Sequence, residues 1–117
     1  MNKLILNIGL NVGDVYNKAH EEFTLNKIRT LFNPYPYLLS FPPKKEGVSD
    51  WNEEQTLVVG VESITLSPRM REKLIQLCID LKQDAIALTY NDKGEMIFNP
   101  NYKGERYEFK KEYFTRF

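Results

Sequence analysis

The stretch from Thr56 to Tyr90 constrains the fold most, because two short apolar runs flank a segment with a clear helix start. The first run, Thr56 to Glu62, is rich in β-branched residues and lacks proline, so it predicts a buried or half-buried strand. Ser67 and Pro68 then predict the start of a helix. The serine side chain can accept a free backbone N–H, and proline at the first helical position has no donor to lose. The second run, Ala85 to Tyr90, alternates small and large residues, which favours a strand.

The helix predicted between these strands is amphipathic. Its apolar side chains recur every three or four residues, and its charged side chains lie mostly elsewhere. The apolar stripe comprises Met70, Leu74, Leu77, Cys78 and Leu81, widened by Ile75 and Ile79. The region therefore predicts a strand, a helix with one side against a sheet, and a second strand.

The rest of the chain supplies further elements of the same kinds. These are a strand over residues 3–11, a helix over roughly residues 19–32, an edge strand over residues 37–41 and, after a turn at residues 91–94, a return strand over residues 95–99. Pro34 and Pro36 end the first helix, because neither can donate the next backbone hydrogen bond. Val12, Gly13 and Asp14 are expected to form a turn.

The order β-α-β-β-α-β with an added strand is the split-βαβ pattern of ferredoxin-like folds. We therefore expect an α+β fold: a ferredoxin-like βαββαβ antiparallel sheet with two helices on one face and an added C-terminal hairpin strand. The first and third strands should be central. The 117 residues are expected to form a single domain, 1–117, with a long polar loop at residues 42–55 and an aromatic tail at residues 101–117.

Composition argues against several functional classes. The 16 basic and 16 acidic residues give no net charge, so no global field favours nucleic acid or an anionic membrane. The single cysteine allows no internal disulfide, and no Cys/His cluster has the spacing of a zinc site. No apolar run approaches the length of a membrane span, and the N-terminal run is too short for a signal peptide. We therefore expect a soluble cytoplasmic protein without metal or other cofactor.

Individual residues give little support for catalysis. His20, the only histidine, has no nucleophile near it in the sequence, so a surface position is expected. Cys78 lies on the apolar stripe and is expected to be an inert buried thiol. The turn from Gly9 to Gly13 lacks the spacing of a phosphate-binding loop. No catalytic residue is assigned, since an enzyme would need an acid/base pair drawn from Glu62, Asp84 or His20.

The two faces of the predicted sheet differ in bulk. One face carries the large side chains that the helices should cover: Leu4, Leu6, Ile8, Leu10, Leu57, Val59, Val61, Ile86, Leu88 and Tyr90. The opposite face is thin and carries Asn7, Gly9, Asn11, Thr56, Val58, Gly60, Glu62, Ala85, Ala87 and Thr89. Glycine inside a strand often marks a close approach of another group, so Gly9, Gly60 and Ala87 could lie side by side and form a shallow depression.

Three occupants of this thin face remain open: the aromatic C-terminal tail, a second copy of the chain or another protein, and a small ligand. A protein partner would bind at Gly9, Gly60 and Ala87. Trp51 is added to this set because a tryptophan in a charged loop either anchors a partner or caps the core. For a small ligand, the predicted polar contacts are Asn7, Asn11, Thr56 and Glu62.

Several short segments together resemble small uncharacterised proteins encoded by phages and other mobile elements. These segments are Asn7 to Asn11, Thr56 to Val59, Leu77 with Cys78, Gln83 to Ala87, and the aromatic end at Tyr113 and Phe114. The resemblance implies an accessory or counter-defence factor that binds a host protein or sequesters a small molecule. The lysine-rich loop around Trp51 departs from that pattern, which puts any shared contact surface there in doubt.

The leading hypothesis is a non-enzymatic binding protein whose partner is a host protein or a second copy of the chain. The alternative is a protein that binds or sequesters a small, nucleotide-like ligand. An enzyme is the third hypothesis. The three differ in what they require: an accessible apolar surface, a pocket with converging polar groups, or a group placed for proton transfer.

Overall fold

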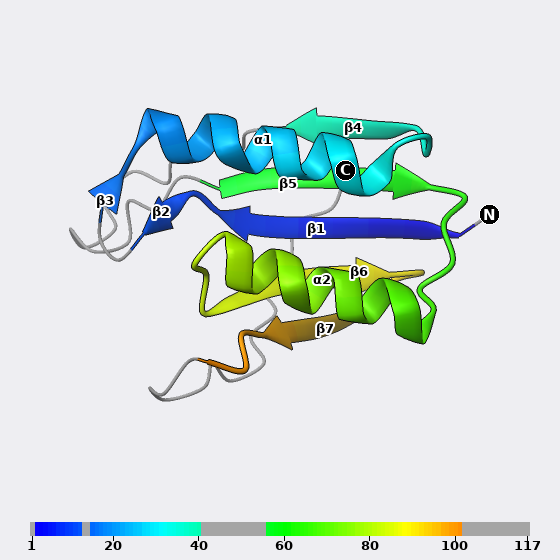
Figure 1. Ribbon diagram of the computed structural model, residues 1–117. Coiled ribbons are helices and arrows are strands. Elements are labelled where there is room, and N and C mark those ends of the chain that lie inside the picture. Colours follow the sequence, from blue (N-terminus) through cyan, green and yellow to red (C-terminus); the bar gives the residue numbers. More distant parts are fainter. Residues whose placement is uncertain (1, 13–14, 41–55, 102–117) are drawn as a thin grey trace, which may run out of the picture.

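A five-stranded antiparallel sheet forms the centre of the molecule (Figure 1). The structure, a computed structural model, describes residues 2–12, 15–40 and 56–101. Its sheet contains β1 (Lys3–Gly9), β4 (Tyr37–Ser40), β5 (Thr56–Glu62), β6 (Ala85–Tyr90) and β7 (Lys93–Phe98), in the spatial order β4-β5-β1-β6-β7. The other elements are α1 (Lys18–Phe32), α2 (Pro68–Asp80) and a small hairpin of β2 (Asn11–Val12) and β3 (Val15–Tyr16).

The register fixes which residues share a face. Within β1, Leu6 lies opposite Val59 of β5 on one side and Leu88 of β6 on the other. All three side chains are fully buried. Because successive strand residues point to opposite faces, this row and its even-numbered neighbours in β1 form one continuous apolar surface.

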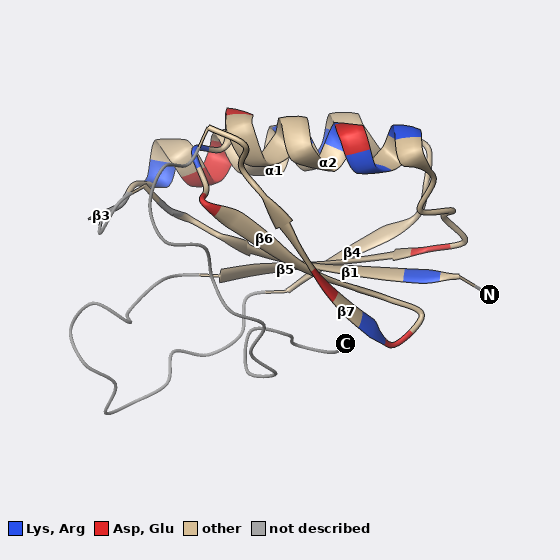
Figure 2. Ribbon diagram, turned by 90° about the horizontal axis from the view of Figure 1, so that it is seen from below, with Lys and Arg blue, Asp and Glu red and all other residues tan. Residues whose placement is uncertain are grey.

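Both helices cover that surface, as Figure 2 shows, and we call it the helix face. Ile28 and Phe32 of α1 and Leu74 and Cys78 of α2 are completely buried in the resulting core. Each large side chain in such a core contributes about 1.5–3 kcal/mol through removal from water. The opposite surface of the sheet, which neither α1 nor α2 covers, is called the far face.

Capping residues set the helix starts. Asn17 accepts a hydrogen bond from the backbone N–H of Ala19 at the start of α1. Ser67 accepts one from Met70 at the start of α2, and Pro68 occupies the first turn. Each cap satisfies a backbone donor that has no partner inside the helix.

The expected α+β fold is confirmed: the sheet is antiparallel, both helices lie on one face, and a hairpin strand follows the fourth predicted strand. The strands predicted at residues 56–62 and 85–90 have the predicted bounds. The edge strand predicted at 37–41 is described as far as Ser40. The loop at residues 42–55, with Trp51, and the tail beyond Asn101 lie outside the described residues.

Two segments differ from the expectation. The first predicted strand ends at Gly9, and Asn11 and Val12 instead pair with β3 as a separate hairpin. The last turn is also shorter than predicted, because β7 begins at Lys93. Asn91 and Asp92 adopt φ angles of 49° and 69°, and a two-residue turn with both central residues in the left-handed region matches the twist of the strands that it joins.

Candidate functional site

The far face brings together part of the predicted contact set. Asn7, in the middle of β1, lies between Val58 of β5 and Ala87 of β6. Gly60 lies one row away, opposite Ile5, and Gly9 lies one row away in the other direction, opposite Thr56. The three small residues Gly9, Gly60 and Ala87 therefore occupy successive rows rather than positions side by side.

This face is buried around Asn7. The exposed fractions of Ile5, Asn7, Val58, Ala87 and Thr89 are all between 2% and 8%. The side-chain nitrogen of Asn7 is buried and has no hydrogen-bond partner. A buried amide without a partner costs free energy, so Asn7 is the most unusual polar residue of the sheet.

The four predicted ligand-binding residues do not converge on one point. Thr56 and Glu62 are the first and last residues of β5, so their Cα atoms lie about 20 Å apart at the usual rise of a strand. Asn7 lies between these ends, and Asn11 belongs to the β2–β3 hairpin. One ligand of nucleotide size could not contact all four residues at once.

Glu62 and Gly60 do line a common hollow on the sheet. This hollow has a volume of about 230 Å³ and is lined by Lys3, Pro36, Tyr37, Leu38, Gly60 and Glu62. It joins one predicted partner-binding residue, Gly60, to one predicted ligand-binding residue, Glu62. The two belong to the same surface at the end of β5.

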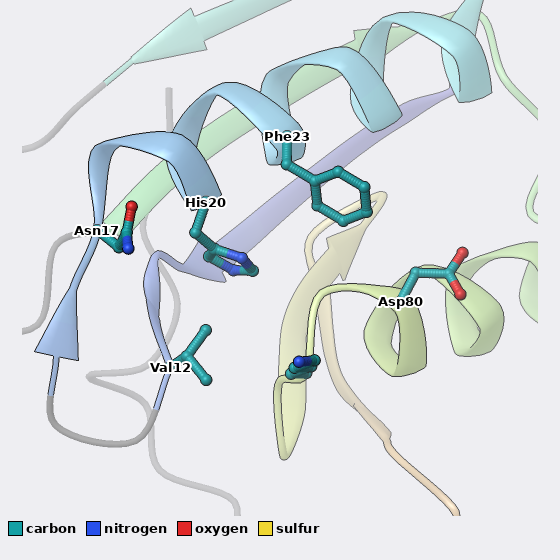
Figure 3. Close-up of a pocket in the computed structure, with 6 residues that line it drawn as sticks. Val12, Asn17, His20, Phe23 and Asp80 are labelled. Atoms are coloured by element: carbon teal, nitrogen blue, oxygen red, sulfur yellow. The ribbon is translucent and has the colours of Figure 1, made fainter.

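A larger cleft lies at the other end of the molecule, where the start of α1 meets the end of α2 (Figure 3). We call it the end cleft. It has a volume of about 430 Å³ and is lined by Val12, Asn17, His20, Phe23, Asp80 and Lys82. Figure 3 shows His20 and Phe23 projecting from α1 toward the end of α2, with Val12 coming from β2.

Two rings form one wall of the end cleft. The ring centroids of His20 and Phe23 lie 6.2 Å apart with an interplanar angle of 32°. The ammonium group of Lys27 lies 5.4 Å from the centroid of the Phe23 ring, within range of a cation–π interaction. Phe23 itself is 42% exposed, so a large apolar ring is left open to an incoming group.

Asp80 supplies the negative charge of the end cleft. One carboxylate oxygen accepts a hydrogen bond from the side chain of Gln76 at 2.8 Å. The other lies 3.5 Å from the ammonium group of Lys27. Because the pair is partly exposed, this ion pair contributes little to stability, and it positions the carboxylate beside the ring wall.

His20 differs from the expected surface histidine. The residue is partly buried, and its Nε2 atom is buried without a hydrogen-bond partner. Buried polar atoms normally have a partner, so an exception is a reason to look for a missing group. Sequence reasoning missed the end cleft, because His20 and Asp80 are 60 positions apart and no local pattern links them.

The described residues give less support for a cysteine nucleophile, a metal site or a membrane-spanning helix. Burial, and secondly the carboxylate of Asp84, raise the pKa of the Cys78 thiol from 9.0 to about 12, which removes its nucleophilic form at neutral pH. Within residues 2–12, 15–40 and 56–101, no three His, Cys, Asp or Glu side chains gather as a metal site would require. In the same part of the chain, neither helix combines the length and apolar character of a membrane span.

Comparisons with known proteins give two similar structures. The chain matches no known family model and no curated protein sequence. A phage SAM lyase in its apo state superposes with a TM-score of 0.54 at 14% sequence identity. A phage SAM lyase in complex with S-methyl-5'-thioadenosine superposes with a TM-score of 0.53 at 18% identity. Each covers 87% of this chain and 92% of the other, so the likeness is one of the whole fold.

Proposed function

We propose that this protein binds a small nucleoside-type ligand in the end cleft, with S-methyl-5'-thioadenosine as the reference compound. The observation that carries the proposal is the pairing of an aromatic wall with a carboxylate in one cleft, in a fold that has been solved with this nucleoside bound. The proposal corresponds to the second of the sequence-based hypotheses.

The chemistry of the end cleft suits a purine nucleoside. A base lying on the exposed face of Phe23 gains stacking energy, typically about 1–3 kcal/mol per base on an aromatic side chain. Asp80 is placed to accept hydrogen bonds from ribose hydroxyls or from an exocyclic amino group, as carboxylates commonly do. The volume of 430 Å³ falls in the usual range of small-molecule pockets.

The unpartnered nitrogen of His20 adds to this argument. A neutral imidazole has one donor and one acceptor nitrogen, so Nε2 can pair with either a hydroxyl or a ring nitrogen of the ligand after a small shift of the side chain. Binding would then satisfy a buried atom that has no partner in the free protein. Such a gain makes the bound state more favourable than the number of new contacts alone suggests.

The biological setting of the proposal is counter-defence in a phage or mobile element. Both similar structures are phage proteins named as SAM lyases. A chain that holds a SAM-related nucleoside would act on the same pool of metabolites, either by sequestering the compound or by converting it. We propose binding as the primary activity and treat conversion of SAM as a separate result of the experiment below.

Association with another protein remains the second candidate function. The observation that favours it is the exposure of Leu38, Leu39 and Tyr35 at one edge of the molecule, since clustered exposed apolar side chains mark interaction surfaces. Trp51, the predicted anchor for such a partner, lies outside the described residues. Gly9, Gly60 and Ala87 stay proposed contact positions on the far face.

Isothermal titration calorimetry with S-methyl-5'-thioadenosine, adenosine and L-methionine tests the ligand proposal. We expect both nucleosides to bind the wild type. Phe23→Ala should lower their affinity at least about tenfold, because the base loses its stacking on the ring. Asp80→Asn should cause a comparable loss. Tyr35→Ala is the matched control, because it removes a similarly exposed aromatic ring outside the end cleft.

Two results would contradict the proposal. One is the absence of binding heat for both nucleosides at millimolar concentration; the other is equal affinity in the wild type and in both cleft variants. Incubation with SAM, followed by chromatography, tests whether the protein converts SAM. Appearance of S-methyl-5'-thioadenosine in the wild type would identify an enzyme, whereas intact SAM would identify a binding protein.

A further inference from the structure

Among the described residues, the strand β4 is an edge of the sheet. In the part of the chain that the structure describes, β4 pairs only with β5. The backbone N–H of Glu62 donates to the carbonyl of Pro36, so Pro36, Leu38 and Ser40 direct their backbone groups toward β5. The backbone groups of Tyr37 and Leu39, between them, therefore point outward from the sheet.

The side chains of this edge are apolar and exposed. Leu38 is 67% exposed and Leu39 is 42% exposed, and the segment Tyr37–Ser40 contains no charged residue. The opposite edge, β7, carries Lys93 and Glu95, which Figure 2 shows as charged positions on that strand. Natural sheets use charges of this kind to protect their edges from pairing, so β7 has this protection and residues 37–40 of β4 lack it.

We infer that β4 is a dimerisation edge that pairs antiparallel with β4 of a second copy of this chain, about a two-fold axis through Leu38. In that register Tyr37 lies opposite the partner's Leu39, and Leu39 lies opposite the partner's Tyr37. These are the two residues with outward backbone groups, so each facing pair exchanges its N–H and carbonyl groups. The two sheets become one continuous sheet, with the helices of both copies on the same face.

The side chains fit this axis. Leu38 meets the partner's Leu38 as a pair without backbone hydrogen bonds between them, the kind of pair in which side chains approach most closely. The most exposed apolar side chain of the edge is thus buried by its own copy. Pro36 lies opposite the partner's Ser40 and has no backbone N–H. The backbone groups of both residues point toward β5 of their own chain, so the missing N–H removes no hydrogen bond between the two copies. No like charges oppose each other across residues 36–40.

Light scattering coupled to gel filtration tests the inference. The variants separate the contribution of backbone hydrogen bonds to dimerisation from that of the side chains. Leu39→Pro removes an outward N–H while keeping every bond of β4 to β5, because proline is tolerated at an edge strand's outer position. Leu38→Lys places two ammonium groups together at the axis. Two variants are controls. Leu39→Ala changes the side chain but keeps the backbone N–H. Met96→Pro removes a backbone N–H from the other edge: Asn99 donates to Asp84, so the backbone groups of Met96, three residues earlier, point away from β6.

We expect the wild type, Leu39→Ala and Met96→Pro to have twice the 13.8 kDa chain mass, with Leu39→Ala at most a few fold weaker in dimerisation. Leu39→Pro and Leu38→Lys are expected to be folded monomers, with circular dichroism like that of the wild type. A monomeric wild type at millimolar concentration overturns the inference, and so does any oligomer that persists in both Leu39→Pro and Leu38→Lys. Hydrogen exchange gives an independent reading, because protection of the Tyr37 and Leu39 amides should rise with protein concentration.

Discussion

The thiol of Cys78 donates a hydrogen bond to the main-chain carbonyl of Gln83, with the sulfur 3.2 Å from the oxygen. The contact joins the last turn of α2 to the segment that leads into β6. The side chain of Asn99 donates to the same carbonyl at 3.1 Å, which adds the end of β7 to the junction. One carbonyl oxygen thus holds three parts of the chain together in the core.

The first prediction concerns the reactivity of this thiol. Cys78 is fully buried and its pKa is raised to about 12, so we expect the native protein to resist a thiol–disulfide reagent at pH 8 and to react only on unfolding. The reaction rate should follow the unfolded fraction as denaturant is added. Rapid labelling without denaturant would contradict the burial of Cys78.

The same pKa difference predicts a dependence of stability on alkaline pH. The folded pKa is raised above the unfolded value of 9.0, so this contribution is complete below pH 9 and is lost as the pH rises from about 9 toward about 12. The free energy of unfolding should fall by up to about 1.4 kcal/mol per pH unit in that window. Cys78→Ala isolates the effect, because it should lack this slope while the other titrating groups remain.

The second prediction concerns Asn7. Its amide nitrogen is buried without a partner at a central position of the sheet, so Asn7→Val should remove a desolvation cost of about 1–3 kcal/mol and raise the free energy of unfolding. Valine also suits a central strand. Chemical denaturation gives the measurement, and Asn7→Ser, which keeps a polar group there, is the control. A loss of more than about 1 kcal/mol in Asn7→Val would show that the amide is satisfied in solution.

The third prediction concerns the cap of α2. Ser67→Ala removes the acceptor for the backbone N–H of Met70 and should lower the free energy of unfolding by about 1 kcal/mol. Ser67→Thr keeps a hydroxyl at the same position and should cost clearly less. Equal losses in the two variants would mean that the serine contributes through packing rather than through its hydrogen bond.

The elements that the sequence predicted well are those with strong local signals. The strand at Thr56–Glu62 and the start of α2 at Pro68 were predicted at the residues where they occur, because β-branched residues and a capping serine act over a few positions. The β2–β3 hairpin was missed, because two-residue strands carry almost no periodicity. The early start of β7 was missed because Gly94 looked like a turn residue rather than a strand residue.

The candidate sites depend on contacts between residues far apart in the sequence, which local patterns do not predict. Alternation correctly separated the helix face of β1 from its far face, but it could not give the register between strands. For that reason Gly9, Gly60 and Ala87 were expected side by side, although pairing sets them in different rows. The end cleft needs the relative position of two helix ends that only the packed core fixes, so His20 and Asp80 could not be linked from the sequence.

The central place of β1 has a consequence for how the protein forms in the cell. β1 precedes the other strands of the sheet in the chain, and both of its partners, β5 and β6, come much later. At about 5–20 residues per second, the ribosome needs roughly 4–16 s to proceed from Gly9 to Tyr90. The apolar strand that organises the core lacks its neighbours for that time, so we expect the nascent chain to expose apolar surface of the kind that chaperones bind.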